Sequence, residues 1–449
     1  MRTRASYICG YVLLFIGLAF LLTGPRIAVY KGNEVVASEK VEERSKQTFE
    51  SQKQKPKTSF VKTSNADPVY PVWAYFDPRF TRISILLLSI YVTNSTAYCH
   101  YFTEDGKADG SPYRIEVQYT TYVLLKIYPD YIANCEENRF SPLITLTEKA
   151  VLPNDFNQSQ LLPVTKIAAG PAEAGLAVCL APIFGDYDHW LLLLQFLETN
   201  RLVGAEKFFI YFLETADKAT LAVLDYYVKQ KLVELITLPR LGRCSEVHRC
   251  RHNFQIQDCI FRTLNRFKYT AVIDIDEVIL PVQHDTLTEL IGSVESSFND
   301  FGAFKFRCRW VPRTEPDPPG VELFKSEQQQ LMSLIEKQLP IVRFRSTTGA
   351  ARQGHTSKCI VKPEAILHMG VHYVRIMRAN WRTYNFPADQ GYVRHYRNTS
   401  TWARKYQEEV GIFGPKQDLP LPRNLEKRVV RAVKCVLSNL RGFDKCDSN

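Results

Sequence analysis

The sequence predicts an α/β protein in which a parallel-sheet domain follows a small, mostly β domain and an N-terminal transmembrane helix. The first observation is an alternation of strand-like and helix-like segments between residues 176 and 275. Short β-rich runs between residues 71 and 165 are the second, and an uncharged apolar segment near the N-terminus is the third. Strands that alternate with helices of about 10–15 residues are typical of βαβ units and a parallel sheet.

The N-terminal segment predicts one membrane span. Residues from Tyr7 to Gly24 carry no charge and are rich in Leu, Ile, Val and Phe. A helix crosses a bilayer with about 20 apolar residues, and about 17 suffice. Arg2 and Arg4 precede the segment, which favours a cytoplasmic N-terminus. A cleaved signal peptide is the alternative, but the residues before Pro25 make a poor cleavage site.

Composition then divides the chain into segments. After a cytoplasmic tail (1–6) and a signal anchor (7–24) comes the segment 25–68, in which residues 31–66 are rich in Lys, Glu, Ser, Gln and Thr. Such a segment cannot bury enough apolar surface to order itself, so we expect a flexible stem. The remaining expected segments are a small β-rich domain at 69–170, an α/β domain at 176–415 and a C-terminal extension at 416–449.

The expected elements follow from apolar periodicity. In the β-rich domain the expected strands are Ile83–Val92, Tyr113–Tyr122 and Tyr122–Ile127. In the α/β domain the expected strands are Leu176–Ile183, Lys207–Phe212, Val233–Leu238 and Tyr269–Ile275, and the expected helices are Trp190–Asn200, Ala219–Gln230 and Gln255–Phe267. Ligands of such sheets bind beyond the carboxyl ends of the strands. We therefore expect the chemistry at the end of the last of these strands.

Charge and cysteine content narrow the class of protein. The net charge is +10, but the Lys and Arg residues are spread along the chain without a basic stripe interleaved with aromatics. This argues against a nucleic-acid partner and leaves an anionic substrate or a membrane surface as the reason for the excess. Ten of the 11 cysteines lie outside the apolar N-terminal segment, and sequons stand at Asn94, Asn157 and Asn398. Both features are typical of an oxidising, lumenal or extracellular compartment.

The strongest local motif is Asp274-Ile275-Asp276, at the end of an apolar strand. If the strand continues to its end, the two aspartates project to one side and Ile275 to the other. A divalent cation would relieve the repulsion between the carboxylates, and hard oxygen ligands suit Mg²⁺ or Mn²⁺. Such a metal can hold a nucleotide diphosphate and stabilise the charge that develops as the diphosphate leaves.

Two other interpretations of this motif stay open. One is a solvated strand end with capping carboxylates. The other is an aspartyl nucleophile, because residues 274–279 also fit the motif of haloacid-dehalogenase-like phosphatases, in which the first aspartate attacks phosphorus. The further acidic pair of those enzymes is not found downstream of Asp276.

Several segments together resemble glycosyltransferase family 92, over roughly residues 176–410. The matching segments are Gly185–Trp190, Leu202–Tyr211, Gln257–Cys259, Ile273–Glu277 and His395–Arg397. The resemblance implies a GT-A (Rossmann-like) glycosyltransferase domain in a type II Golgi membrane protein. It also implies β1,4-galactosyl transfer from UDP-galactose to fucose or galactose on N-glycans. The sequence departs from the family between Trp310 and Pro319, where a Gly/Ser/His-rich loop is usual, which puts acceptor choice in doubt.

Beyond the aspartates, the expected donor and metal residues come from four places. GT-A enzymes often complete the metal shell with a late histidine, here His395, although a structural histidine is the alternative. Arg397 and its neighbour Arg394 could meet a diphosphate, since guanidinium suits phosphate. Asp186 follows the first strand of the α/β domain, where GT-A folds hold the nucleotide, or it caps a helix. Arg243 belongs to a basic Cys/His-containing loop that could face the phosphates, be solvated, carry a disulfide or, with poor spacing, bind zinc.

An inverting transfer also needs a carboxylate that takes the proton from the acceptor hydroxyl. Glu315 and Asp317 lie in a Pro-rich loop after the next strand and are the candidates for this role, with generic loop carboxylates as the alternative. Trp310 could stack on a sugar or lie in the core. The metal motif together with the resemblance implies a Mn²⁺- or Mg²⁺-dependent, inverting galactosyltransferase, with Asp274 ligating the metal or holding the donor ribose. A catalytically silent, membrane-anchored glycan-binding protein is the second hypothesis.

Overall fold

The computed structural model describes residues 70–88, 96–119, 130–136, 138–183, 189–212, 217–238, 251–399, 408 and 412–443. The expected anchor at 7–24 and stem at 25–68 lie outside these ranges. Among the helices that the structure does describe, none combines the length and apolar character that a membrane crossing requires.

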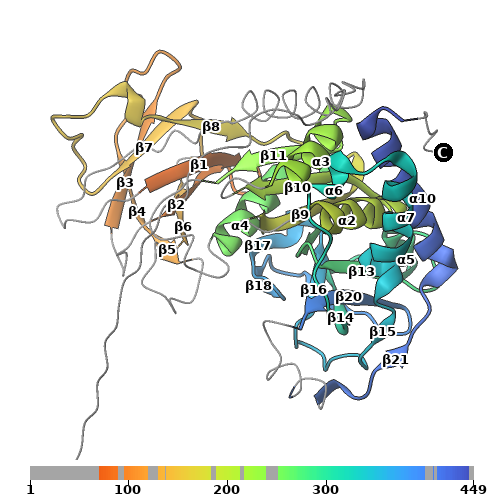
Figure 1. Cartoon of the computed structure of the whole chain (residues 1–449). Coiled ribbons are helices and arrows are strands. Elements are labelled where there is room, and N and C mark those ends of the chain that lie inside the picture. The colour runs from red at the N-terminus through yellow and green to blue at the C-terminus, as the bar shows by residue number, and fades with distance from the viewer. Residues whose placement is uncertain are drawn as a thin grey trace, which may run out of the picture.

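The N-terminal domain is a single curled sheet of eight strands (Figure 1). Its elements are β1 (Tyr70–Asp77), β2 (Arg82–Leu88), β3 (Thr96–Phe102), β4 (Tyr113–Glu116), β5 (Gln118–Tyr119), β6 (Asp130–Cys135), β7 (Leu143–Thr147), η1 (Gln158–Gln160) and β8 (Leu162–Lys166). The order is β4-β3-β7-β8-β1-β2-β6-β5, and the β1–β8 pair is parallel while the others are antiparallel. The small β-rich domain predicted from short strands is thus observed.

Alternation of side chains gives this sheet two different faces. Ile83, Ile85 and Leu87 of β2 point into the domain's own apolar core, whereas Leu86 and Leu88 point outward into a core shared with the second domain. A disulfide between Cys99 of β3 and Cys135 of β6 joins two strands that are not neighbours in the sheet. The domain is therefore held by its own core and attached through its outer face.

The C-terminal domain is built on a nine-stranded sheet. Its strands are β9 (Ala174–Ile183), β10 (Ala205–Phe212), β11 (Val233–Thr237), β12 (Phe267–Ile273), β13 (Glu277–Pro281), β14 (Phe301–Arg313), β16 (Lys358–Val361), β19 (Arg382–Asn385) and β20 (Gly391–Asn398). The order is β11-β10-β9-β12-β16-β14-β20-β13, with β19 beside β14. Strands β9 to β12 are mutually parallel, which confirms the predicted α/β class.

Helices cover both faces of this sheet (Figure 1). They are α2 (Trp190–Leu202), α3 (Lys218–Lys229), α4 (His252–Thr263), α5 (Leu287–Glu295), α6 (Glu322–Lys325), α7 (Gln328–Gln338), α8 (Pro340–Arg343), η3 (Pro363–Ala365), η4 (Pro422–Asn424) and α10 (Leu425–Arg441). Two small antiparallel pairs complete the domain: β15 (Ser346–Thr347) with β21 (Gln417–Asp418), which are distant in the chain, and the hairpin of β17 (Ile366–Met369) with β18 (Val374–Met377).

The central strands send alternate residues to the two helical layers. Val178 and Leu180 of β9 join the core beneath α2 and α3, while Ala177 and Cys179 join the core beneath α4. A disulfide from Cys179 to Cys259 ties α4 to the central strand. Helix α4 thus lies between the large sheet and the outer face of the N-terminal domain.

Helix α10 lies in the segment expected to be a C-terminal extension. Its residues Val429 and Val433 are fully buried in the core that contains α2, and α10 packs against α2 and α7. The described part of residues 416–449 is therefore an integral layer of the C-terminal domain rather than an appendage.

Strand and helix positions agree with the periodic pattern, and the boundaries move by a few residues. The helix expected at Gln255–Phe267 runs from His252 to Thr263 and the following strand ends at Ile273, not Ile275. Helix α4 ends at Thr263 because Leu264 takes a non-helical ψ of 127°, and Asn265 follows with a φ of 59°. Of the strands expected in the β-rich domain, the one at Tyr122–Ile127 lies outside the described residues, and residues 113–119 form two strands in place of one.

A candidate nucleotide-sugar and metal site at the end of β12

The Asp274-Ile275-Asp276 motif lies at the switch point of the parallel sheet. The chain runs outward from β9 through β10 to β11 and then returns to place β12 on the other side of β9. The crossover connections on the two sides leave in opposite directions, and the crevice between them is where open α/β sheets bind ligands. The motif follows the carboxyl end of β12 directly.

A tight turn, not a continuing strand, carries the motif. The Glu277 amide donates to the Asp274 carbonyl at 3.0 Å, and the Asp274 amide donates to the Glu277 carboxylate at 3.0 Å. The Tyr396 amide of β20 donates to the Asp276 carbonyl at 2.7 Å. The two aspartates therefore lie on a turn, closed by hydrogen bonds between Asp274 and Glu277, and do not project from one face of a continuing strand. The side chains of Asp274 and Asp276 remain 28% and 20% exposed.

A buried lysine occupies one side of this turn. Lys358, at the start of β16, is fully buried, and its Nζ lies 3.0 Å from Asp274 Oδ2 and 2.9 Å from Glu277 Oε2. Burial alone would raise the pKa of Asp274, but the neighbouring ammonium holds that pKa well below its usual range. Burial would likewise lower the pKa of Lys358, and the two carboxylates hold it above its usual value. Lys358 therefore neutralises charge on this side of the turn.

Helix α4 contributes a second group to Asp274. Its first residue, His252, is 6% exposed and places Nε2 3.6 Å from Asp274 Oδ1. The N-terminus of a helix carries partial positive charge, which favours a carboxylate there. Asp274 is thus engaged on both oxygens, by Lys358 and by His252.

His395 occupies the other side of the turn. On β20 it lies opposite Glu277 of β13, with Nε2 3.3 Å from Asp276 Oδ2 and Nδ1 3.3 Å from Glu277 Oε1. The Cys308 sulfur lies 3.9 Å from Nδ1, and the Trp310 ring packs at 5.8 Å between centroids. Burial would lower the pKa of His395, but the carboxylates of Asp276 and Glu277 hold it well above the ordinary value.

The Asp276–His395 pair has the chemistry of a divalent metal site. One carboxylate oxygen and one imidazole nitrogen lie close together at a partly exposed edge, and imidazole suits Mn²⁺. Within the described ranges, no group of three His, Cys, Asp or Glu side chains is arranged to hold a metal ion. Mg²⁺ sites commonly take one or two protein carboxylates and complete the shell with substrate phosphates and water. Asp276 and His395 would be the protein ligands of such a site. The charge of Asp274 is already balanced by Lys358 and His252.

The predicted arginines differ in their positions. Arg397 follows on β20, is half-buried, and its positive charge helps His395 to lower the pKa of Asp276 against the effect of burial. Arg394 is fully buried and donates to the carbonyls of Phe344, Arg345 and Leu419, so it is a structural residue. Asp186 and Arg243 lie outside the described residues, as do Cys244 and Cys250 of the basic loop.

Both predicted carboxylates of the Pro-rich loop already have arginine partners. Asp317 pairs with Arg313 through both oxygens at 2.8 and 3.0 Å, while Glu315 pairs with Arg343 and is 60% exposed. The Trp190 indole, at the start of α2, donates to the Pro318 carbonyl at 3.1 Å. Because α2 starts beyond the carboxyl end of β9, this hydrogen bond places the loop at the same edge of the sheet as the acidic turn.

Three residues of the site escape sequence reasoning. Glu277 follows the Asp274–Asp276 motif and His252 belongs to the basic Cys/His-containing loop, but the sequence predicts no role in an acidic site for either. Lys358 had no signal except its position at the start of a short apolar strand, where a lysine is unusual. Trp310, by contrast, is 3% exposed and belongs to the core, as one of its two interpretations held.

Comparison with known proteins places these features in a family. A β-1,4-galactosyltransferase of Caenorhabditis elegans, galt-1, is 25% identical over 228 residues, which cover 50% of this chain and 48% of that protein. The chain thus spans about half the length of this curated relative.

Solved structures give a much weaker likeness. Glucosyl-3-phosphoglycerate synthase from Mycobacterium tuberculosis, in complex with phosphoglyceric acid, matches with a TM-score of 0.25 and 10% identity, covering 61% of this chain and 82% of that one. A mycobacterial protein matches with a TM-score of 0.24 and 12% identity, covering 61% and 76%. Similarity at this level says nothing about the ligands of this chain. The family model described as Glycosyltransferase family 92 matches residues 174–429, more than half of the chain, and the chain therefore belongs to glycosyltransferase family 92.

Proposed function

We propose that this protein is a metal-dependent galactosyltransferase that moves galactose from UDP-galactose to a galactose or fucose hydroxyl of an N-glycan. The observation that carries the proposal is the Asp276–His395 pair, 3.3 Å apart at the switch point of a parallel sheet. Family membership and the name of the worm relative support the sugar transfer and the galactose. We assign the C-terminal domain to the GT-A fold of that family.

In this proposal Asp276 and His395 hold Mn²⁺, or Mg²⁺ in its place. When bound, the metal supplies Lewis-acid stabilisation of a leaving diphosphate. Arg397, next to His395 on β20, adds positive charge on the same side. Asp274, fixed by Lys358 and His252, orients the donor rather than serving as a free ligand.

The acceptor hydroxyl has to lose its proton to a carboxylate in an inverting, β1,4-forming transfer. Glu315 is the better candidate of the two predicted carboxylates. Glu315 is 60% exposed in its pair with Arg343, and ion pairs at the surface contribute little stability, so its carboxylate is the more accessible of the two. Asp317 is 12% exposed and held at both oxygens by Arg313, which makes it a positioning residue for the loop.

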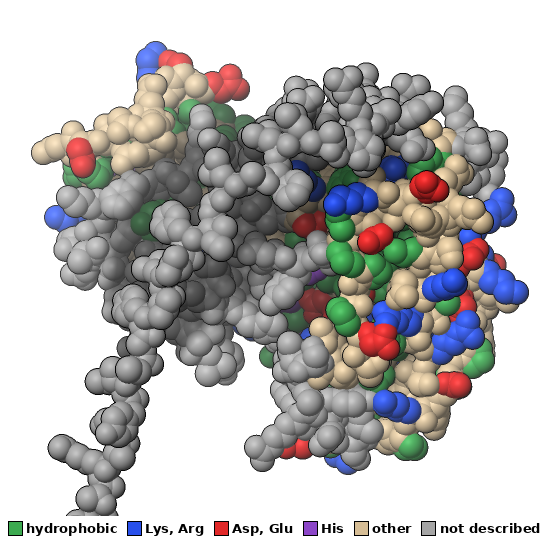
Figure 2. Space-filling model, viewed as in Figure 1, with side chains coloured by type: hydrophobic (Ala, Val, Ile, Leu, Met, Phe, Trp, Pro, Cys, Tyr) green, Lys and Arg blue, Asp and Glu red, His purple; other side chains and the backbone are tan. Residues whose placement is uncertain are grey.

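The proposed location is the Golgi membrane, with a type II topology and a lumenal catalytic domain. Two observations support it: disulfides join Cys99 to Cys135 and Cys179 to Cys259, and the residues from Tyr7 to Gly24 form an uncharged apolar segment. Disulfides of this kind persist in oxidising compartments. Nucleic acid is not among the proposed partners; Figure 2 shows Lys and Arg side chains interspersed with acidic ones over the visible part of the C-terminal domain.

The test is a transfer assay on the full-length chain in detergent. A panel of UDP-sugars and N-glycans with and without Mn²⁺ should give Mn²⁺-dependent transfer from UDP-galactose. Donor hydrolysis without acceptor provides a second readout of the same site. Glycan binding with no donor turnover would instead favour the glycan-binding protein, and a phosphorylated Asp274 the phosphatase.

A further inference from the structure

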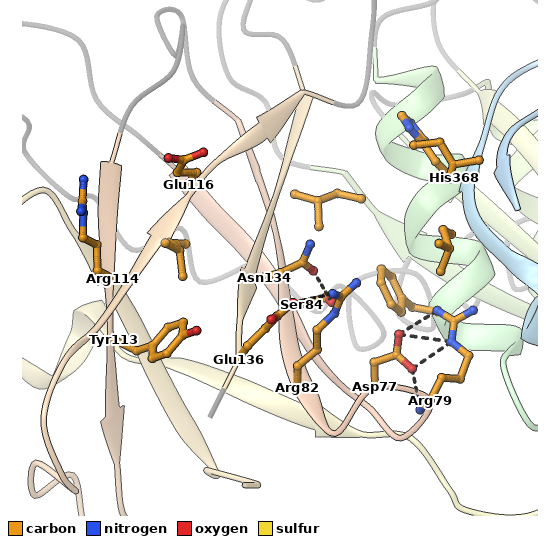
Figure 3. A pocket seen from close by; sticks show the side chains of 15 residues that line it. Asp77, Arg79, Arg82, Ser84, Tyr113, Arg114, Glu116, Asn134, Glu136 and His368 are labelled. Carbon is orange, nitrogen blue, oxygen red and sulfur yellow. Dashed lines mark hydrogen bonds and ion pairs between the residues drawn. The ribbon is translucent and has the colours of Figure 1, made fainter. Parts of the chain in front are cut away.

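A cleft separate from the acidic turn lies between the two domains (Figure 3). Its volume is about 480 Å³. One wall is the outer face of β2 and β6 with the edge strand β4, and the other is formed by Phe261 of α4 and by Leu367, His368 and Ile376 of the β17–β18 hairpin. The cleft therefore needs both domains, and neither would form it alone.

The cleft lies where the outer face of the N-terminal sheet changes from apolar to polar side chains. Leu86 and Leu88, on the outer face of β2, pack into the core shared with α4. Toward the other end of the same face the side chains become polar: Ser84 donates to Asn134 at 2.8 Å, and Arg82 donates to Glu136 at 2.8 Å. The apolar half attaches the domains, and the polar half lines a cavity between them.

The floor of the cleft is rigid. Arg79 pairs with Asp77 at 2.7 Å, and the two side chains are 7% and 1% exposed. The same guanidinium donates to the carbonyls of Pro363 and Ile366 at 3.0 and 2.6 Å, and so links the N-terminal domain to the hairpin. A preformed site loses little free energy in ordering its side chains when a ligand binds.

Charge in the cleft is balanced, which selects the class of ligand. The lining contains three arginines and three carboxylates, and four of these six are paired with each other: Arg79 with Asp77, and Arg82 with Glu136. A diphosphate or an acidic peptide would find no surplus of positive charge there. A neutral ligand with many hydroxyls can both donate and accept among paired polar groups, and its C–H faces can pack on Tyr113, Phe261 or Ile376.

We propose that this cleft binds the neutral sugars of an extended acceptor glycan, a subsite apart from the point of transfer; this rests on the proposed function for the identity of the acceptor. Helix α4 connects the two places. His252 at its start contacts Asp274, and Phe261 lines the cleft nine residues later, roughly 14 Å along the helix axis. A single sugar is too short for that distance, so only an acceptor of several sugars would occupy both places.

The test compares long and short acceptors in the full-length chain. Asn134→Ala and Tyr113→Ala each remove a polar or aromatic group from the cleft. We expect each to raise KM for an extended neutral N-glycan about tenfold, as loss of one or two such contacts does. Donor hydrolysis and the KM for a methyl galactoside should stay unchanged. Phe298→Ala, which removes an aromatic ring that is 56% exposed and not part of the cleft lining, is the matched control and should change nothing.

Direct binding separates failure of this subsite from failure of the transferase proposal. Titration of the wild-type chain with the extended glycan, without donor, should show binding that both variants weaken about tenfold. Cleft-dependent binding in a chain that never turns over UDP-galactose would keep the subsite and overturn the transfer. Unchanged KM and binding in both variants would overturn the subsite, and so would equal binding of the deglycosylated acceptor protein, which would assign the cleft to polypeptide. The thermal midpoints of the variants show whether they fold.

Discussion

Two clusters of acidic and basic side chains invite comparison: one surrounds a single buried aspartate, and the other contains three neighbouring carboxylates. The Asp258 cluster lies between the domains and consists of Asp258, Tyr75, Tyr211 and Arg262. The Asp274 cluster lies at the end of β12 and consists of Asp274, Asp276, Glu277, Lys358 and His395. Each cluster contains acidic residues of a segment that resembles the family: Gln257–Cys259 for the first and Ile273–Glu277 for the second.

The Asp258 cluster is closed. Asp258 is fully buried and accepts hydrogen bonds from the hydroxyls of Tyr75 and Tyr211 and from Arg262 Nε at 2.5 Å. Burial raises the pKa of both tyrosines well above the ordinary value, so they remain neutral donors. Arg262 balances the charge of Asp258 and also pairs with Glu234 at 3.4 Å, and the network joins β1 of the first domain to α4 and β10 of the second.

The Asp274 cluster is open and brings three carboxylates together at one turn. Three carboxylates face Lys358 and two histidines, and Asp274 and Asp276 keep 28% and 20% of their side chains exposed. Burial raises the pKa of Glu277 even with Lys358 beside it. Like charges held together with access to solvent are costly unless a cation arrives. Exposure and the crowding of several carboxylates, rather than the presence of a buried acid, therefore distinguish the candidate binding site from the structural cluster.

The largest effect on the transfer rate should follow from removing the carboxylate of Asp276, a partly exposed acid of the Asp274 cluster. Asp276→Asn keeps the size of the side chain but removes the carboxylate opposite His395, and metal stabilisation of several kcal/mol corresponds to a loss of transfer of about 10²–10³-fold. Initial rates at saturating Mn²⁺ check this. Asp389→Asn, on an exposed turn before β20, is the control and should keep wild-type rates. Full turnover by Asp276→Asn would remove the acidic turn from the mechanism.

Removing the Lys358 ammonium should lower the stability of the fold more than it lowers the transfer rate. Lys358→Met leaves Asp274 and Glu277 together without their ammonium, and breaking a buried pair costs about 3–5 kcal/mol. Urea unfolding at neutral pH measures this. Lys362→Met, whose partner Glu295 is partly exposed, is a milder comparison.

A double variant sharpens that result. Lys358→Met with Glu277→Gln removes one of the two stranded carboxylates, so part of the lost stability should return, and the difference from additivity gives the coupling. A double variant no more stable than Lys358→Met alone would contradict the ion pair as the source of the loss.

Sequence periodicity was sufficient for the order of elements around the site. The strands at Leu176–Ile183 and Lys207–Phe212 and the helix that begins at Trp190 carry long apolar stretches, and the structure has them within a few residues. The sequence predicts a strand through Ile275, but the structure has a turn there. The turn depends on hydrogen bonds between Asp274 and Glu277 and on one from the Tyr396 amide to the Asp276 carbonyl, 120 residues earlier in the chain. Local propensity contains no information about such a partner.

The same limit explains the missed site residues. Asp274 and Asp276 stand out because two acids interrupt an apolar run, and His395 because its segment resembles a family motif. Lys358 acts only because β16 inserts antiparallel between β12 and β14, and that pairing is non-local. Conversely, the family-matching segment Gln257–Cys259 makes structural contacts: Gln257 donates to the Met369 carbonyl, Asp258 accepts from Tyr211, and Cys259 is disulfide-bonded to Cys179.

The Asp258 cluster gives the opposite prediction, a loss of stability without a loss of transfer rate. Asp258→Asn keeps an acceptor for the tyrosines but leaves Arg262 without its nearest carboxylate, and hydrogen bonds to charged groups contribute about 1.5–3 kcal/mol. We expect stability to fall by about that amount while the transfer rate per folded molecule stays at the wild-type level. Active-site titration with a UDP analogue corrects for unfolded protein. A corrected rate that fell with stability would show that this cluster also serves the acidic turn.

The smallest effect should come from one hydroxyl of the closed cluster. Tyr75→Phe removes a single donor to Asp258 and keeps the ring, which stacks on Phe261 at 5.1 Å, so we expect a loss of about 1 kcal/mol. Tyr373→Phe, a ring that is 49% exposed, is the control and should be neutral. Because Tyr75 belongs to the N-terminal domain and Asp258 to the C-terminal one, the loss should appear as easier proteolysis between the domains as well as in urea unfolding. A stability loss with unchanged proteolysis would mean that the hydroxyl stabilises α4 but does not hold the two domains together.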